Sequence, residues 1–478
     1  MEVRIPSLWD LLTEGEGTMV YLATTAGPQW TYDDLRRDVA GASEALRQSG
    51  VRPGHGVALK IADPGCFVVW LFAILAAGAI AVPINPRAPE DDARRTLETS
   101  HASYWVAEPH QIQALDAPSP PWTTDNPGVI LLTSGSTGDP KPVGLPWPSL
   151  LHTARQVAEA HQFTSSDRGF SPLPLFHINA LVVALLGSLV AKSRILIAER
   201  FHASTFWETV DRDAITWINA VPAILAVLTE RPEVPVHPER VRFIRSASAP
   251  LPEAIRHRAE SRFGIGIVET YGMTEASSQI TANLLPGHST HPGSVGIPRG
   301  VEVRVAGKDG RALGARSRGA IEIRGPGVID PDWGPNQWAR QVMRDGWYPT
   351  GDIGYLNENG YLFLSGRGRD VINRGGEKIF PREVEDWFLI HPAIAECALV
   401  GRPHPLLGEV PILFVVPNPA AHFDDAALRD WASEGLAAFK QPVDYVVVES
   451  LPKGPTGKVS RPQLRRLART RQPAHVHA

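Results

Sequence analysis

Apolar and polar residues follow one another along the first hundred positions with the spacing of helices that alternate with short strands. Residues 33–49 carry apolar side chains at helical intervals, and residues 56–61 form a short apolar run. Residues 66–84 are almost uninterrupted apolar and come near the length that spans a bilayer. Gly78 and Pro83 divide them into a helix and a strand, and no cluster of Lys or Arg marks a membrane boundary. We therefore expect a buried helix and strand of a parallel sheet, not a membrane span.

The same α/β pattern continues to about residue 293 and then changes twice. Residues 109–127 have no periodicity and are typical of a surface connection. Beyond residue 293, short strands with turn residues predict a small antiparallel or barrel-like region. From residue 371 onward, helix and strand signals form a compact α+β block. The prediction is an α/β fold with a large, multi-layer N-terminal domain of mixed sheets (1–366), a hinge (367–370) and a small, mobile α+β C-terminal domain (371–478).

Composition and charge narrow the class of protein. With 478 residues, 43% hydrophobic and 21% charged, the chain is long enough for two or more ordinary globular domains. Its formal net charge of -4 gives no electrostatic reason to expect nucleic acid or an anionic membrane as a partner. Two cysteines exclude a disulfide framework and suit a reducing cytoplasm, and the first residues lack the pattern of a secretory signal. We expect a cytoplasmic protein, and both a monomer and a homodimer stay open.

The strongest chemical signal is the segment Leu-Leu-Thr-Ser-Gly-Ser-Thr-Gly-Asp-Pro-Lys at residues 131–141. A predicted strand runs into small hydroxyl and glycine residues, and the segment ends in a lysine. Backbone N–H groups, hydroxyls and an ammonium can surround phosphate oxygens there without steric obstruction. The segment is not the GxxxxGK[ST] loop, and a stretch rich in Gly, Ser and Thr is by itself more often a flexible turn. The rest of the chain must decide between the two.

This segment resembles the phosphate loop of the adenylate-forming superfamily, which includes acyl-CoA synthetases, peptide-synthetase adenylation domains and beetle luciferases. Five further segments resemble that superfamily in the same order along the chain, so coincidence is negligible. They are Pro-Leu-Phe-His at 174–177, Glu-Thr-Tyr-Gly-Met-Thr-Glu at 269–275, Tyr-Pro-Thr-Gly-Asp at 348–352, Gly-Arg-Gly-Arg-Asp at 366–370 (with Gly-Gly-Glu-Lys-Ile at 375–379) and Leu-Pro-Lys-Gly-Pro-Thr-Gly-Lys at 451–458.

The resemblance implies four catalytic residues. Adenylation brings a carboxylate to the α-phosphorus of ATP, so two anions must be drawn together, and Lys458 is the candidate that bridges them. Glu275 is expected to hold Mg²⁺, with Thr137 as a helper. His177 would close the acyl pocket or donate to the substrate carboxylate. By residue type alone, Lys458 would be a surface charge, Glu275 an acid at a helix start and His177 a core histidine.

The resemblance also implies the nucleotide site and the hinge. Asp352 and Arg367 are expected to bind the ribose hydroxyls, although an ordinary ion pair is the alternative, and Tyr271 is expected to stack on adenine. Arg369 stands where the superfamily usually has Asp or Lys at its hinge. The expected nucleotide-binding residues are Thr133, Ser134, Gly135, Ser136, Thr137, Gly138, Lys141, Thr270, Tyr271, Gly272, Met273, Thr274, Asp352, Arg367 and Lys458.

The acyl pocket is expected to be small. Thr270 stands where many aryl and fatty-acyl ligases have glycine, and its extra atoms should shorten the pocket. Residues 242–248 and 373–379 look like those of oxalyl-CoA synthetases, which favours a small or polar acid. The expected lining is His177, Asn179, Ala220, Ser246, Ala247, Ser248 and Thr270.

The resemblance implies an ATP- and Mg²⁺-dependent ligase that forms an acyl-adenylate from a small-molecule acid and passes the acyl group to coenzyme A. A separate carrier protein, an amine, or nitrite activation for diazotisation are the alternatives. An adenylate-binding regulator without activity is disfavoured, because the hinge and Lys458 are both present.

Overall fold

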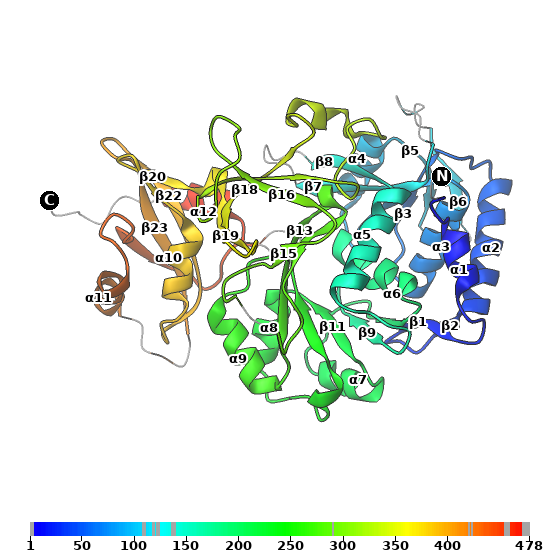
Figure 1. Cartoon of the computed structure of the whole chain (residues 1–478), viewed down its shortest axis with the longest axis horizontal. Coiled ribbons are helices and arrows are strands. Elements are labelled where there is room, and N and C mark those ends of the chain that lie inside the picture. The colour runs from blue at the N-terminus through cyan, green and yellow to red at the C-terminus, as the bar shows by residue number, and fades with distance from the viewer. Residues whose placement is uncertain are drawn as a thin grey trace.

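The computed structural model describes residues 4–107, 111–116, 120, 125–134, 140–288, 291–418, 421, 424–453 and 459–470. The chain runs from N-terminal helices (blue, right) to a separate group of helices and strands (orange to red, left) in Figure 1. Of the four sheets in the described part of the chain, three belong to the large part and one to the small part. The predicted α/β fold, with mixed sheets in a large N-terminal domain and a small C-terminal domain, is confirmed.

The six-stranded sheet has the order β6-β5-β3-β4-β7-β8. Its four central strands are parallel, and the edge strands β6 and β8 are antiparallel to their neighbours. The apolar run 66–84 forms the expected buried helix and strand, and Asp63 caps that helix by accepting from the Cys66 N–H. No helix in the described ranges is long and apolar enough to cross a membrane. The elements are β3 (Gly56–Leu59), α3 (Pro64–Ala76), β4 (Ile80–Pro83), α4 (Glu90–Ser100), β5 (Ala102–Val106), β6 (Ile112–Ala114), β7 (Gly128–Ser134) and β8 (Pro140–Pro146).

The nine-stranded sheet has the order β15-β14-β13-β12-β11-β9-β10-β1-β2. Six consecutive strands, from β13 to β1, run parallel, and the remaining strands are antiparallel at the two edges. Parallel strands end at a common edge, which is where open α/β sheets bind ligands. The strands are β1 (Val20–Thr24), β2 (Gln29–Thr31), β9 (Arg168–Ser171), β10 (Arg194–Ile197), β11 (Trp217–Ala220), β12 (Phe243–Ser246), β13 (Ile267–Met273), β14 (Ser278–Ala282) and β15 (Ile297–Pro298).

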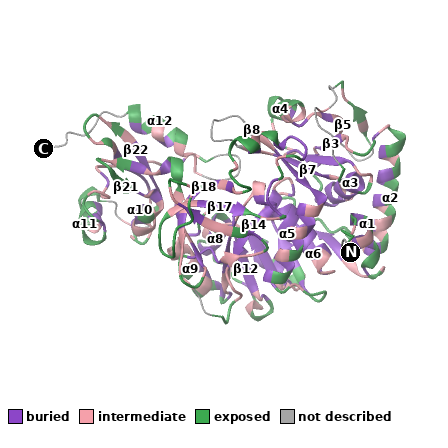
Figure 2. Ribbon diagram, turned by 45° about the horizontal axis from the view of Figure 1, so that its top comes forward, coloured by how far each residue is buried: buried purple, intermediate pink, exposed green. Residues whose placement is uncertain are grey.

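Helices cover these two sheets, and the strands between them are almost wholly buried (purple in Figure 2). The π-helix η1 is buried along its whole length and begins at Asn179. A π-helix in the middle of a domain often marks a functional position. The helices are α1 (Leu8–Glu14), α2 (Tyr32–Gln48), α5 (Trp147–Ala160), η1 (Asn179–Leu186), α6 (Gly187–Val190), α7 (Phe206–Arg212), α8 (Pro222–Thr229), η2 (Pro238–Arg240), α9 (Glu253–Phe263) and η3 (Thr274–Ala276).

The region predicted as antiparallel or barrel-like is a four-stranded antiparallel sheet. Its order is β16-β17-β18-β19, so the antiparallel expectation is confirmed. The elements are β16 (Glu302–Ala306), β17 (Gly319–Arg324), η4 (Asn336–Gln341), β18 (Tyr348–Leu356), β19 (Leu362–Arg367) and η5 (Gly368–Asp370).

The C-terminal sheet is buried on both faces. Along β22, Cys397 and Leu399 pack with α10 and α11, whereas Ala398 and Val400 pack with α12 on the other face. The apolar clusters of this part are separate from the main core, which ends near Leu362. The elements are β20 (Ile372–Arg374), β21 (Glu377–Ile379), α10 (Pro381–Phe388), β22 (Ile394–His404), β23 (Gly408–Pro417), α11 (Asp425–Gly435), β24 (Asp444–Val447) and α12 (Arg461–Thr470).

Candidate active site

Three residues predicted to bind the nucleoside lie together where β13 meets β18 and β19. Asp352 faces Arg367 across the strand pair, and its Oδ1 lies 2.8 Å from Arg367 Nε. The Tyr271 hydroxyl donates to Asp352 Oδ2 at 2.5 Å, and burial, with the Asp352 charge, raises the pKa of Tyr271 well above its usual range. The carboxylate is therefore held in place from one side, while Arg367 stays 43% exposed on the other. A fixed carboxylate can accept hydrogen bonds from the two neighbouring hydroxyls of a ribose, and an accessible guanidinium can donate to them.

The predicted phosphate loop connects the two strands of a hairpin. Thr133 pairs with Lys141, and Ser134 with Pro140, in the β7–β8 register. Lys141 Nζ lies 5.0 Å from the centre of the Trp338 ring, whose Nε1 donates to the Pro142 carbonyl at 2.9 Å. Pro142, an unusual residue for this loop, fits because β8 is an edge strand and needs no N–H there. Gly135, Ser136, Thr137 and Gly138 lie outside the described residues, so their phosphate contacts stay predictions.

The segment 270–275 contains a sharp turn at Gly272. A Cβ at Gly272 would lie 1.5 Å from the Ser278 carbonyl oxygen, so only glycine fits this turn. Gly272, Met273, Thr274 and Glu275 are all partly exposed. Glu275 lies in η3, and its carbonyl accepts from the Ile329 N–H at 2.7 Å.

Glu275 fits the expected way of holding Mg²⁺. The described residues contain no group of three His, Cys, Asp or Glu side chains that could hold a metal ion by themselves. Mg²⁺ usually takes one or two protein carboxylates together with phosphate oxygens and water. A single half-exposed carboxylate beside a nucleotide site matches that preference.

The predicted hinge segment contacts the last helix, α12. Asp370 in η5 is buried, and Arg465 of α12 reaches both its Oδ1 and the Arg369 carbonyl at 2.9 Å. Arg461 Nε lies 3.6 Å from Asp370 Oδ2. The Arg369 side chain itself is exposed, and Gly366 has a φ of 137°, which favours glycine. The contacts of Asp370 would therefore move with the small domain, and the role of Arg369 stays a prediction.

A second contact between the two parts was not predicted. Glu269, at the start of the segment 269–275, lies 3.9 Å from Arg382 of α10. Burial raises the pKa of Glu269 to about 7, and that of Asp386, which also contacts Arg382, to about 6. The sequence did not predict this contact, because Arg382 belongs to none of the segments that resemble the superfamily.

Lys458 lies outside the described residues, so its catalytic role stays a prediction. The structure does describe where its segment is anchored. Lys453 and Val459 form an isolated β-bridge, and the Ser460 N–H donates to the Pro452 carbonyl at 2.7 Å. Lys453 also lies 2.9 Å from Glu396 of β22. The two ends of the segment are thus joined at the surface of the small domain.

The predicted acyl-pocket residues come from two faces of the nine-stranded sheet. Ala220 and Ser246 are register partners, so they share the face on which Glu269 also lies. Thr270 belongs to the opposite face, toward η1 and Asn179. Ser246 and Thr270 are buried, and neither hydroxyl has a hydrogen-bond partner among the described residues.

The loop after β12 joins these faces. Asn179 Nδ2 donates to Ser248 Oγ at 3.1 Å, and Ser248 is exposed with a φ of 72°. Ala247 beside it is buried. His177, half-buried just before η1, has its ring 4.5 Å from that of Phe176. Asn179 and Ser248 therefore meet at the end of β12, and the contacts of the predicted pocket residues with an acid stay predictions.

Arg245 is the residue here that sequence reasoning missed. It is 1% exposed, and its guanidinium donates to Asn179 Oδ1 at 2.9 Å, Asn219 Oδ1 at 3.2 Å and Gln279 Oε1 at 3.4 Å. All three acceptors are neutral amides. A charged residue inside a predicted strand, in the run Arg-Phe-Ile-Arg, was the available signal.

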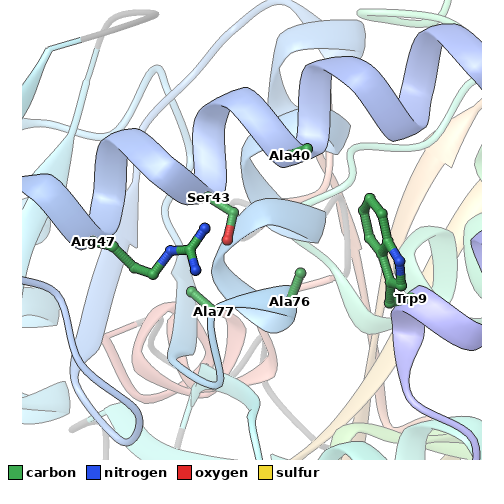
Figure 3. Close-up of a pocket in the computed structure, with 6 residues that line it drawn as sticks. All are labelled: Trp9, Ala40, Ser43, Arg47, Ala76 and Ala77. Carbon is green, nitrogen blue, oxygen red and sulfur yellow. The ribbon is translucent and has the colours of Figure 1, made fainter.

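Two cavities lie away from these groups. One of about 320 Å³ is lined by Trp9, Ala40, Ser43, Arg47, Ala76 and Ala77, between the N-terminal helices (Figure 3). It contains no predicted site residue. A small one of about 40 Å³ includes Pro174, Leu175 and Phe176 of the segment that precedes His177.

Comparison with known proteins decides the family. The model of the family described as AMP-binding enzyme matches residues 14–120 and 107–330, and that of its C-terminal domain matches residues 383–458. The chain belongs to the AMP-binding enzyme family. The resemblance drawn from the six sequence segments is therefore confirmed.

Relatives of this AMP-binding enzyme match it over most of their length. It is 38% identical over 384 residues to the sulfoacetate–CoA ligase of Cupriavidus necator, covering 80% of this chain and 73% of the relative. It is 32% identical over 462 residues to the oxalate–CoA ligase of Arabidopsis thaliana, covering 88% and 90%. Among solved structures, the o-succinylbenzoate CoA synthetase of Bacillus subtilis with ATP and magnesium ion aligns with a TM-score of 0.83 at 28% identity, covering 96% and 99%.

Proposed function

We propose that this enzyme activates a small or polar carboxylic acid with ATP and transfers the acyl group to coenzyme A. The observation that carries the proposal is the cluster of Asp352, Arg367 and Tyr271, in a chain of the AMP-binding enzyme family. The relatives named as CoA ligases support an AMP-forming acid–CoA ligase.

The reaction has two halves. A carboxylate oxygen of the acid attacks the α-phosphorus of ATP, the bond to the β-phosphate oxygen breaks, and acyl-AMP and pyrophosphate form. The thiol of coenzyme A then attacks the acyl carbon, loses its proton and releases AMP. Asp352 and Arg367 hold the ribose, Lys141 and the hairpin hold phosphates, and Lys458 neutralises the charge that develops between the two anions. Mg²⁺ bound at Glu275 would neutralise phosphate charge.

The hinge serves the second half-reaction. Rotation of the small domain about residues 366–370 would withdraw Lys458 and open a path for the thiol. The Glu269–Arg382 contact would have to break or reform in that rotation, since its partners belong to the two moving parts. A carrier-protein thiol, an amine and nitrite activation are the competing outcomes. Both cysteine thiols are free, which suits a cytoplasmic enzyme.

The first experiment is acid-dependent release of pyrophosphate, with ATP and Mg²⁺, for short, dicarboxylic, aryl and medium-chain acids and for nitrite. Each is assayed with and without coenzyme A. A thioester product formed with one class of acid supports the proposal. Release with nitrite alone, or a requirement for an amine, would replace the thiol acceptor and leave the adenylation step standing.

Lys458→Ala tests the adenylation step itself. We expect a loss of acyl-AMP formation of about 10³-fold with ATP binding largely intact, because the lysine neutralises charge mainly in the transition state. Lys308→Ala removes an exposed lysine of the large domain and serves as the matched control. Near-normal acyl-AMP formation by Lys458→Ala would overturn the mechanism.

A further inference from the structure

Arg245 carries a buried positive charge that the protein leaves without a counter-charge. It is the one Lys or Arg side chain that is buried in the described part of the chain. No carboxylate in that part forms an ion pair with it. Burial lowers the pKa of its guanidinium to about 9, so the group stays charged near neutral pH. Burying an ion is costly when no opposite charge compensates it.

The polar atoms left over around this guanidinium are donors. Gln279 must turn its Oε1 toward Arg245, because a guanidinium only donates, and so its Nε2 points elsewhere. Arg245 Nε, Gln279 Nε2 and Thr270 Oγ1 are buried, and none has a partner among the residues that the structure describes. Two N–H groups and a hydroxyl beside a cation match an acceptor with negative charge.

These donors lie on one face of the sheet. Asn219 and Val268 are the register partners of Arg245 on its two neighbouring strands, and Thr270 follows Val268 by two residues. Successive residues of a strand alternate between faces, so Arg245 and Thr270 share one. Gln279 faces them through its bond to the guanidinium. The predicted acyl-pocket residue Thr270 is thus part of the same polar face.

A chain of hydrogen bonds leads from the buried charge to the surface of the predicted pocket. Arg245 donates to Asn179 Oδ1, and Asn179 Nδ2 donates to Ser248 Oγ. Ser248 is exposed and holds a positive φ, which is uncommon for a non-glycine residue. Only the side chain of Asn179 therefore separates the Arg245 guanidinium from Ser248, which would contact the acid.

We propose that the acid this enzyme activates carries a second anionic group, a carboxylate or a sulfonate. This group binds next to Asn179 and Thr270 and supplies the counter-charge for Arg245, which lies behind these two residues. Arg245 is then a specificity-determining residue that acts partly through Asn179. The inference rests on the proposed ligase function and narrows its substrate class to short acids with two negative charges. A fatty acid or an aryl monoacid brings no charge to this face.

The test compares acids that differ only in the second charge. Purified enzyme with ATP and Mg²⁺ is assayed by acid-dependent ATP–pyrophosphate exchange with malonate against its monomethyl ester, and with sulfoacetate against methylsulfonylacetate. We expect kcat/KM to favour one doubly charged acid over its singly charged counterpart by about 100-fold or more, as expected for a charged group that loses its hydrogen-bonding partner. The two pairs distinguish a carboxylate from a sulfonate.

Two variants test whether Arg245 is the cause. Arg245→Met removes the charge, and Asn219→Asp keeps Arg245 but places a carboxylate beside it. In both we expect the preference to fall to within about threefold, with KM for ATP unchanged, because the nucleotide site is not touched. Asn219→Asp also guards against a folding defect of Arg245→Met. Arg242→Lys, which keeps a charge beside Asp167, is the control and should keep the preference.

The outcomes separate the two proposals. A wild-type enzyme that prefers the singly charged acid of each pair, or variants that keep the 100-fold preference, would overturn the role of Arg245 and leave the ligase function standing. No exchange with any acid would overturn the ligase proposal and this inference with it.

Discussion

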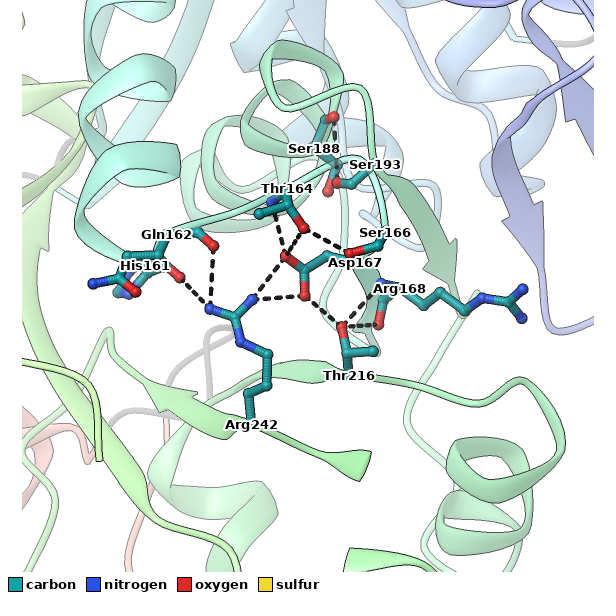
Figure 4. A network of polar contacts seen from close by, with 10 residues as sticks. All are labelled: His161, Gln162, Thr164, Ser166, Asp167, Arg168, Ser188, Ser193, Thr216 and Arg242. Atoms are coloured by element: carbon teal, nitrogen blue, oxygen red, sulfur yellow. Dashed lines mark hydrogen bonds and ion pairs between the residues drawn. The ribbon is translucent and has the colours of Figure 1, made fainter. Parts of the chain in front are cut away.

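Arg242 and Arg245 are separated by two residues on one segment, and the protein treats their charges in opposite ways. Arg242, just before β12, places its Nη1 2.7 Å from both carboxylate oxygens of Asp167, and its Nη2 donates to the carbonyls of His161 and Gln162 (Figure 4). Arg245, near the other end of the strand, has neutral amides alone as partners.

The two ends of the strand explain the difference. Arg242 lies at the edge where β9, β11 and β12 begin, and the Asp167 carboxylate there also accepts from the Thr216 hydroxyl and the Thr164 N–H (Figure 4). The buried Asp167 carboxylate is thus matched by the Arg242 guanidinium. Arg245 lies toward the edge where parallel strands end and ligands bind. An unpaired charge at that edge indicates a side chain whose counter-ion is a bound ligand rather than a residue of the protein.

Breaking the matched pair should have the largest effect on stability. Arg242→Met leaves Asp167, whose side chain is 3% exposed, as a buried carboxylate without its cation. We expect a loss of about 3 kcal/mol in the free energy of unfolding of the large domain, measured by urea denaturation. The substrate preference of the protein that stays folded should not change.

The double variant Asp167→Asn with Arg242→Met tests whether that loss of stability comes from the unpaired carboxylate. If the cost arises from the unpaired carboxylate, the double variant should recover about half of it. A double variant as unstable as the sum of both single variants would mean that the two residues do not act as a pair.

The next effect concerns His161, which connects the two arginines. Its carbonyl accepts from Arg242, and its Nε2 lies 3.2 Å from the same Gln279 oxygen that Arg245 approaches. Burial, with the charges of Arg245, Arg299 and Arg242, lowers the pKa of His161 to about 3 from an ordinary 6.5. The unfolded chain therefore binds one more proton between these values. The stability due to neutral His161 is complete above about pH 6.5 and is lost as the pH falls toward 3.

His161→Gln should remove this pH dependence while keeping a polar group beside Gln279. We expect wild-type stability to fall by about 2 kcal/mol more than that of the variant between about pH 7.5 and pH 5. Urea midpoints at the two pH values measure the difference. Equal losses in both proteins would show that His161 is not the residue that senses acid.

The smallest effect should come from matching the unmatched charge. Asn219→Asp places a carboxylate 26 positions from Arg245 in sequence and directly beside it in the sheet. We expect the free energy of unfolding to rise by about 1 kcal/mol. The new carboxylate compensates the buried charge of Arg245, which destabilises the wild-type fold. A variant less stable than the wild type, by thermal denaturation, would show that Arg245 is already satisfied by its amides.

The sequence predicted the frame of the molecule well and its long-range polar contacts poorly. The helix Tyr32–Gln48 lies within a residue of its predicted range, 33–49, because its apolar spacing is regular. The strand Ile112–Ala114 was missed, since one half-buried and two exposed residues at a sheet edge leave no periodic signal. The cluster of Asp352 and Arg367 was predicted through motifs rather than through periodicity.

The surroundings of Arg245 could not be predicted from local pattern. Its amide partners Asn179, Asn219 and Gln279 come from a π-helix and two other strands, and only the folded sheet places them together. An isolated arginine in a strand pattern gives no sign of whether an acid will face it. Roles assigned to Thr137 and Lys458 stay predictions, because both lie outside the described residues.

The bridge between Lys453 and Val459 has a consequence for how the segment of Lys458 responds to changes in length. A loop whose ends are already joined loses little further chain entropy when a residue is added, on the order of a few tenths of a kcal/mol. An insertion between these ends would therefore scarcely register in the stability of the small domain, yet it would change how far the lysine reaches. Selection for folding alone would not maintain the length of this segment, whereas the predicted catalytic role of Lys458 would.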